Sequence, residues 1–311
     1  MKKVLFALFA VAAMVSCSNN EVIELNREQI AFGDTFVDNA TKADYSTDKV
    51  VEGFKVYGTV TANANTMQVF NGADVTRDGK ADGEAWNCTT TQYWLPSATY
   101  NFAAIVDGEA ATQNNGLPAT INHAVADGAD LLYTTATVTV TTDGTATPTT
   151  GVNGNKVVAF NFTHLLSKLQ FTIANTTDQT YKVTSIKVEN VAKNGVYSVD
   201  GGTWAPGDAG EVELYFGTAD VPAESAGVVA SKTHQILPLP LEQTLNVTIT
   251  YDIMKGEKNL GTMTKSGSIT EEFAKNTVYN VTATLSGTAI SFSLGTIDEW
   301  NTPIVEVTPT L

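Results

Sequence analysis

The feature that most restricts the fold of this chain is its high content of β-branched residues, above all threonine. The 311 residues include 46 Thr, beside abundant Val. β-branched side chains lose rotamer freedom in a helix and pack well on a pleated sheet. Stretches rich in Ala, Glu, Lys and Leu, which favour helices, are almost absent. The sequence therefore predicts an all-β protein.

Short segments with strand-like composition recur along the chain, separated by Gly, Asn and Asp turn signals. We expect strands at 53–60, 100–106, 131–140, 156–162, 168–175, 181–188, 246–253, 277–285 and 289–294. Many short strands without a long helical pattern are typical of antiparallel β-sandwiches. The length suggests two domains, and a boundary near residues 162–166 divides the chain into halves of similar size.

The N-terminus has the pattern of an export signal. Lys2 and Lys3 precede an apolar run at 4–15, which at about 12 residues is too short to span a bilayer. The run ends in Met14-Val15-Ser16-Cys17, which resembles a bacterial lipobox. The resemblance implies cleavage before Cys17 and lipid attachment to its thiol. The alternative is an ordinary signal peptide in which Cys17 stands by chance.

Composition and motif content disfavour several classes of function. The net charge of −15 would repel a nucleic-acid backbone, so we expect no nucleic-acid partner. The three His and two Cys are widely spaced, and the chain contains neither G-x-S-x-G nor H-E-x-x-H. We therefore predict that the protein is not an enzyme and has no cofactor. His164, at the end of an apolar segment, is interpreted as a hydrogen-bonded structural residue.

One loop, from Asp74 to Glu84, partly imitates a calcium-binding loop. Carboxylates occupy its first, fifth and ninth places and Gly79 its sixth, but Ala85 stands where the bidentate glutamate belongs. A hairpin turn rich in Asp and Gly explains the segment as well. Two interpretations of the tryptophans are also open, a sugar-stacking platform or core packing. The residues concerned are Trp86, Trp94, Trp204 and Trp300.

A series of motifs, taken in order, resembles one known family. The segment Phe160-Asn161-Phe162-Thr163-His164-Leu165-Leu166-Ser167-Lys168-Leu169-Gln170-Phe171 is similar to the F-x-H-x-L-[SA]-K-L-x-F signature of fimbrillins, the type V pilins and Mfa-like lipoproteins of Bacteroidota. Four further motifs, two of which consist of two segments, match in the family's order: Tyr93-Trp94-Leu95-Pro96 with Tyr100-Asn101-Phe102, Asp130-Leu131-Leu132-Tyr133, Ile236-Leu237-Pro238, and Asn276-Thr277-Val278-Tyr279 with Ile297-Asp298-Glu299-Trp300.

The resemblance implies a division of the precursor into four parts. Residues 1–16 would form the lipoprotein signal and 17–44 a propeptide with a removable first strand. Two transthyretin-like β-sandwich domains would follow at 45–164 and 165–311. The segment at 303–311 would be a donor strand or, as the alternative, the last strand of the second domain. The precursor would be anchored by lipid in the cell outer membrane, and the mature subunit would lie in an extracellular fimbrium.

The resemblance also implies a mechanism of assembly. A trypsin-like protease would cut between Lys42 and Ala43, within the matching triplet Thr41-Lys42-Ala43, or less favourably after Arg27. The cut would release a strand at about 28–37, and a neighbouring subunit would supply a strand in its place. The inward-facing residues of the removable strand would be Ile30, Phe32 and Phe36, and those of the donor strand Ile304, Val305 and Val307.

The family resemblance implies other fimbrial subunits as partners, with a host or bacterial surface ligand for adhesion. It leaves open a shaft, tip or anchor position. The alternative function is that of a monomeric surface lipoprotein that binds a glycan or a host protein. The discriminating feature is the pair of end segments, because only an assembling subunit needs a removable strand and a donor strand.

Overall fold

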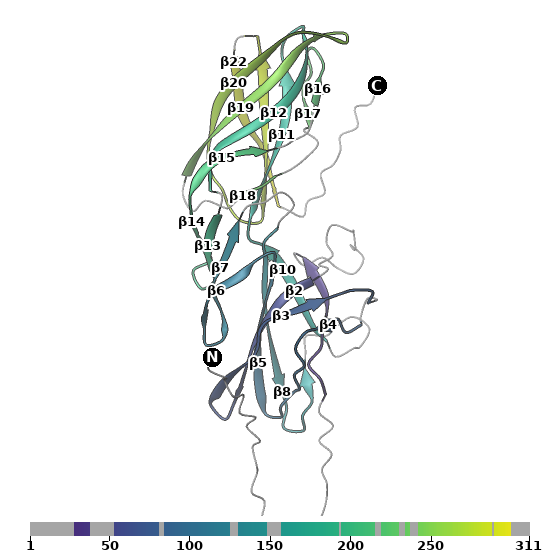
Figure 1. Cartoon of the computed structure of the whole chain (residues 1–311), viewed down its shortest axis with the longest axis vertical. Helices are drawn as coiled ribbons and strands as arrows, with labels where there is room; N and C mark the ends of the chain where they lie inside the picture. Colours follow the sequence, from purple (N-terminus) through teal and green to yellow (C-terminus); the bar gives the residue numbers. More distant parts are fainter. Residues whose placement is uncertain are drawn as a thin grey trace, which may run out of the picture.

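The computed structural model describes residues 28–37, 53–80, 84–124, 130–147, 157–192, 194–214, 219–229, 234–236, 242–287 and 289–299. Every regular element in these ranges is a β-strand, and Figure 1 shows two lobes stacked along the long axis. The all-β class predicted from the Thr-rich composition is confirmed. Across these ranges, no helix is long and apolar enough to cross a membrane.

The first lobe is built on one eight-stranded sheet. Its order is β1 (Phe32–Val37), β10 (Val158–His164), β8 (Leu132–Val140), β5 (Ala98–Val106), β2 (Gly53–Ala62), β3 (Asn65–Thr76) and β4 (Asn87–Cys88), and β9 (Ala146–Thr147) pairs with β8. Alternate residues of these strands point to one side and form an aromatic core. Its rings include Phe32, Phe54, Phe70, Phe102 and Phe160.

The second lobe contains two five-stranded sheets. The first has the order β17 (Val228–Val229), β11 (Ser167–Asn175), β21 (Thr277–Ser286) and β22 (Ala289–Glu299), and β18 (His234–Ile236) also pairs with β11. The second has the order β15 (Ala209–Leu214), β12 (Thr180–Ala192), β19 (Glu242–Lys255) and β20 (Lys258–Glu272), and β16 (Ala219–Val221) also pairs with β12. Buried side chains of both sheets belong to one core, among them Phe171 of β11 and Ile249 of β19.

The strand pairs are antiparallel with two exceptions. β1 runs parallel to β10, and β11 runs parallel to β21 over residues 167–175. The antiparallel pairing expected from the sequence therefore has one parallel exception in each lobe. In both cases the first described strand of the lobe pairs with a strand from much later in the sequence.

A four-stranded sheet connects the two halves of the chain, and we call it the joint sheet. It consists of β14 (Thr203–Pro206), β13 (Asn194–Ser198), β7 (Leu117–Ala124) and β6 (Glu109–Asn114). β7 and β13 pair antiparallel, from Asn194 opposite Ala124 to Ser198 opposite Thr120. Ile121, Tyr197 and Trp204 of this sheet are buried in the core that continues into the second lobe. Each half therefore contributes strands to the joint sheet.

Candidate functional site

The segment before β2 occupies the aromatic core of the first lobe. Ile30 is 1% exposed and Phe32 is 0% exposed. The Phe32 ring lies edge-on to Phe70 and Phe102, with centroid distances of 5.2 and 5.6 Å, and stacks on Phe160 at 5.9 Å. Burial of a Phe side chain stabilises a fold by roughly 1.5–3 kcal/mol. This strand is therefore an integral part of the core.

Main-chain hydrogen bonds hold the same segment from two sides. On one side the Val158 amide donates to the carbonyl of Ala31 at 2.8 Å, and β1 continues along β10. On the other side the Ile30 amide donates to Gln92 at 2.8 Å, and the Trp86 amide donates to Phe32 at 2.8 Å. The segment therefore lies between β10 and residues 84–94 and is hydrogen-bonded to both.

The contact at Gly33 requires a residue without a side chain. A Cβ atom built at Gly33 would lie 2.7 Å from the carbonyl oxygen of Glu84, a distance that real Cβ atoms do not reach. Beyond this point the register slips by one residue, so that Phe36 is opposite Asn161 and Val37 is opposite Phe162. Val37 is buried. The side chain of Phe36 lies outside the described residues.

β1 stands at the end of the eight-stranded sheet, with β10 as its only neighbour in the strand order. If β1 were removed, the main chain of β10 would become an open edge beside the rings of Phe54, Phe70, Phe102 and Phe160. Such an edge accepts another strand by main-chain hydrogen bonding, while an apolar floor takes alternate side chains. We call this combination the strand groove.

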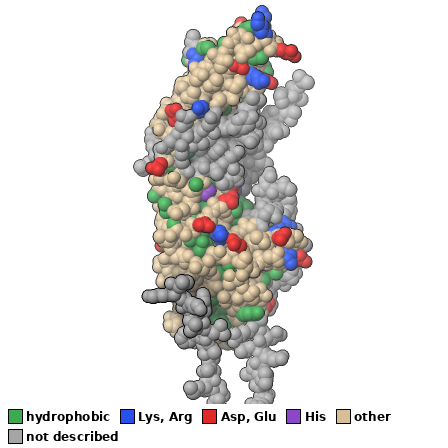
Figure 2. Space-filling view, in the orientation of Figure 1, with side chains coloured by type: hydrophobic (Ala, Val, Ile, Leu, Met, Phe, Trp, Pro, Cys, Tyr) green, Lys and Arg blue, Asp and Glu red, His purple; other side chains and the backbone are tan. Residues whose placement is uncertain are grey.

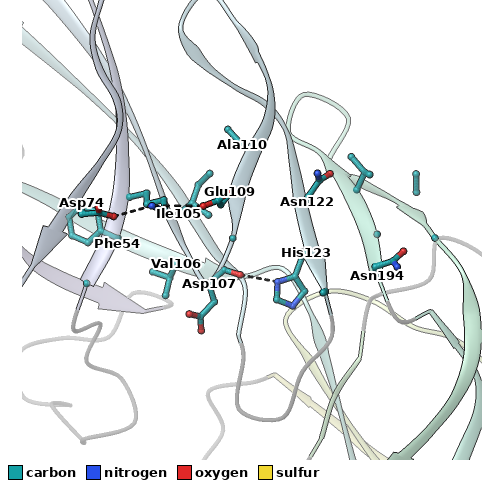
Figure 3. A pocket seen from close by; sticks show the side chains of 18 of the residues that line it. Phe54, Asp74, Ile105, Val106, Asp107, Glu109, Ala110, Asn122, His123 and Asn194 are labelled. Atoms are coloured by element: carbon teal, nitrogen blue, oxygen red, sulfur yellow. Dashed lines mark hydrogen bonds and ion pairs between the residues drawn. The ribbon is translucent and has the colours of Figure 1, made fainter.

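A second candidate site is an open hollow of about 1180 Å³ between the first lobe and the joint sheet, which we call the joint trough. Figure 3 shows several of the side chains that line it. One wall comes from β2 and β3, the other from β7, β13 and β14, and the chain from Ile105 to Ala110 crosses beneath them. Figure 2 shows acidic and basic side chains gathered on this part of the molecule, over the first lobe.

An ionic group lies on one side of the joint trough. The Lys55 ammonium is 3.1 Å from the Asp74 carboxylate and 3.9 Å from that of Glu109 (Figure 3). The hydrogen bond to Asp74 is the main cause that raises the pKa of Lys55. Both carboxylates remain largely exposed, 58% for Asp74 and 78% for Glu109, so the pairs fix positions more than they stabilise the fold.

Comparisons with known proteins place the chain in a family. A model of the fimbrillin-like family matches residues 41–300. The chain belongs to the fimbrillin-like family. This is a family of fimbrial structural proteins and not of enzymes, and its members belong to the cell surface. Among curated proteins, none matches the chain.

Solved structures show the same fold as this fimbrillin-like chain. A fimbrial protein from Bacteroides vulgatus is 19% identical, with a TM-score of 0.62, and the match covers 88% of this chain and 100% of the other. A protein from Bacteroides ovatus that is assigned to cell adhesion is 12% identical, with a TM-score of 0.53 and coverage of 89% and 99%. A similarly assigned protein from Bacteroides uniformis is 18% identical, with a TM-score of 0.52 and coverage of 88% and 99%.

Two of the three histidines of this fimbrillin-like chain, His123 and His164, lie at the joint between the lobes. His123 of β7 donates from Nδ1 to the carbonyl oxygen of Asp107 at 3.0 Å. Nδ1 of His164, at the end of β10, is 2.7 Å from the Asp130 carboxylate. The Asp130 amide in turn donates to the Asp107 carboxylate at 3.2 Å. His164 therefore makes a polar contact at a structural joint, as interpreted from the sequence.

The calcium-like loop and the tryptophans can be placed in part. Asp74 pairs with Lys55, and the Lys80 amide closes a turn on the Arg77 carbonyl at 2.9 Å. Within the described ranges, no group of three or more His, Cys, Asp or Glu side chains could hold a metal ion. Three tryptophans are buried in cores: Trp86, Trp94 and Trp204. Trp300 lies outside the described residues, as do 81–83 of the loop.

Several predicted site residues lie outside the part of the chain that the structure describes. They are Cys17 for lipidation, Arg27, Lys42 and Ala43 for processing, and Ile304, Val305 and Val307 for the donor strand. The joint trough was not predicted from the sequence. Its residues carry no motif, and they meet only because β7 pairs with β13 across 70 residues of chain.

Proposed function

We propose that this fimbrillin-like chain is the precursor of a fimbrial subunit that assembles by protease-triggered strand exchange. The observation that supports this most directly is the position of β1. It is a core strand, with Phe32 fully buried, and also an edge strand, with one neighbour in its sheet. Removal of this strand breaks its pairing with β10 and its main-chain hydrogen bonds to residues 84–94, and it leaves the remaining order of the sheet intact.

Energetics favour the tethered strand before cleavage and an incoming strand afterwards. While β1 is covalently attached, its effective concentration at the groove is in the millimolar range or above. Cleavage makes it a dissociable peptide, and a donor strand of similar length can then restore the same main-chain bonds and apolar contacts. Because the contact joins two different surfaces, its repetition extends a filament rather than closing a ring.

The remaining steps of the proposal follow the family resemblance. Cys17 would carry the lipid that holds the precursor at the outer membrane. A trypsin-like protease would cut between Lys42 and Ala43, with Arg27 as the less favoured cut. The mature subunit would comprise domains at 45–164 and 165–311, and its donor strand would use Ile304, Val305 and Val307. Assembly on the cell surface would serve adhesion.

The cut at Lys42 provides the test. The Lys42→Gln precursor should remain monomeric on the cell, whereas the Lys49→Gln control should form the SDS-resistant ladder of a polymer. N-terminal sequencing of the control polymer should begin at Ala43. If Lys42→Gln polymerises normally while Arg27 is shown to be uncut, then N-terminal processing is not the trigger of assembly.

A further inference from the structure

We propose that the joint trough is a binding site for an uncharged oligosaccharide. A large hollow with apolar lining and a few convergent polar groups is the expected form of a small-molecule site. The proposal concerns the face of the molecule between the lobe and the joint sheet. It is independent of strand exchange, because none of the trough residues belongs to β1 or β10.

The polar side chains of the trough provide both donors and acceptors on one face of the joint sheet. A row across the joint sheet places Glu109 opposite Asn122 and Asn122 opposite Val196. Asn194 lies two residues from Val196 on the same face of β13. Each carboxamide offers two donors and an acceptor, while the carboxylate only accepts. Sugar hydroxyls donate and accept at once, so this mixture matches them.

The opposite wall adds a fixed donor and acceptor. Lys55 and Asp74 hold each other at 3.1 Å, which orients both groups before a ligand arrives. Oriented partners reduce the entropy that a ligand must otherwise lose on binding. Glu109 lies between this wall and Asn122. Its carboxylate is 3.9 Å from the Lys55 ammonium, and its main chain is opposite that of Asn122. A chain of polar groups therefore runs from one wall to the other (Figure 3).

Small and apolar residues supply the rest of the surface. Val196 is 38% exposed, which is high for a large apolar side chain in a strand centre. Ala205 lies opposite it on β14, and Pro206 and Gly207 follow. Val196 and Ala205 therefore form a small apolar patch without bulky side chains, against which the C–H face of a sugar ring can pack.

An added peptide strand fits the trough less well, because the central strands that line it already have partners on both sides. β2 lies between β3 and β5, and β7 lies between β6 and β13. On the edge strand β6, the Ala110 amide donates to the Tyr57 hydroxyl at 3.3 Å, so this donor is not available to a further strand. The edge strand β14 ends at Pro206, which has no amide hydrogen to donate.

Charge distinguishes among glycans. Among the described residues that line the trough, Lys55 is the one Lys or Arg side chain, and Asp74, Asp107 and Glu109 provide three carboxylates. Sialylated or sulfated sugars would therefore meet a negative field in a chain whose net charge is −15. Uncharged oligosaccharides meet no such repulsion.

The test measures glycan binding by the full chain in detergent micelles. An array of neutral oligosaccharides gives the first screen, and calorimetry with lactose, maltotriose and any array hit gives affinities. Sialyllactose and a hexalysine peptide are the charged comparisons. The Asn122→Ala and Asn194→Ala variants should each weaken neutral-glycan binding by roughly tenfold, because each removes a ligand hydrogen bond from an exposed side chain. Asn246→Ala, on β19 of the second lobe, is the matched control and should bind as the unaltered chain does.

Several outcomes would overturn the proposal. One is that no neutral glycan on the array binds. Another is that the trough variants and Asn246→Ala bind alike with unchanged melting temperatures. Stronger binding of sialyllactose would contradict the charge argument. Binding of hexalysine that is lost in Glu109→Gln, without neutral-glycan binding, would instead identify a site for cationic peptides.

Discussion

At the scale of single residues, the hydroxyl of Tyr100 fixes the turn before β5. It accepts a hydrogen bond from the Leu95 amide at 2.8 Å and donates to the Tyr93 carbonyl at 3.1 Å. Its ring meets Trp94 edge-on at 4.8 Å. Ser97, three residues before the tyrosine, has a positive φ of 53°. The turn thus combines a satisfied buried hydroxyl with one strained residue.

The second lobe repeats this arrangement at Tyr279 with the same spacing. The hydroxyl accepts from the Ala274 amide at 2.7 Å and donates to the Glu272 carbonyl at 3.0 Å. The ring meets Phe273 at 4.9 Å, and Asn276 has a φ of 58°. Both turns therefore use a tyrosine bonded five and seven residues back. The sequence shows these segments only as separate resemblances to the family, because hydroxyl contacts cannot be identified in a single sequence.

We predict that Tyr100→Phe and Tyr279→Phe each lower the free energy of unfolding by about 1–3 kcal/mol. Each change leaves a main-chain donor and a main-chain acceptor without their partner. Urea denaturation followed by circular dichroism provides the measurement. Tyr93→Phe is the control, because its side chain is 47% exposed and the change should stay within about 0.5 kcal/mol. Equal effects at Tyr93 and Tyr100 would contradict the role given to the hydroxyls.

At the scale of elements, the strands found from the sequence are those with one buried face. β21 is an example, since its buried and half-buried residues alternate along most of its length. β20 was missed because nearly all of its residues are exposed, so that it lacks an alternating apolar pattern. It is held instead by pairing with β19, including hydroxyl contacts such as Thr248 to Ser266 at 2.8 Å. Such partners cannot be identified from local sequence.

The family resemblance implies a removable strand with Ile30 and Phe32 facing inward, and the structure places both side chains in the core. We predict that Phe32→Ala lowers the free energy of unfolding of the first lobe by about 3–5 kcal/mol, because it opens a cavity among four aromatic rings. The change is measured by urea denaturation with tryptophan fluorescence from Trp86 and Trp94. Gln29→Ala, on the exposed side of the same segment, should have little effect. A small loss for Phe32→Ala would show that the strand contributes little to the core.

At the scale of the whole molecule, the joint between the lobes is both apolar and polar. Trp204 of β14 donates from its indole to the Leu165 carbonyl at 2.9 Å, directly after β10. His123 of β7, on the same buried face of the joint sheet, donates to the Asp107 carbonyl. These contacts link residues far apart in sequence, which is why the predicted boundary near 162–166 could not indicate how closely the halves are connected. We infer that the two halves of the chain unfold together.

The joint should make the molecule sensitive to mild acid through His123. Its Nδ1 donates to a carbonyl, and its buried Nε2 has no partner among the described residues. Burial lowers the pKa of His123, while the carboxylates of Asp107 and Asp130 oppose the shift. An unfolded histidine titrates near 6.5, so below that pH the unfolded chain binds more protons than the folded chain.

We therefore predict that stability falls as the pH is lowered from about 7.5 through about 6.5 to 5.5. The measurement is the urea midpoint at each pH for the unaltered chain and for His123→Gln, whose carboxamide can still donate to the Asp107 carbonyl but does not titrate. The variant should lose less stability over this range, and fluorescence and circular dichroism should report the same midpoint if the lobes unfold together. Carboxylates titrate alike in both proteins at lower pH. An identical decline between pH 7.5 and 5.5 in both proteins would show that His123 is not the acid-sensitive group of the joint.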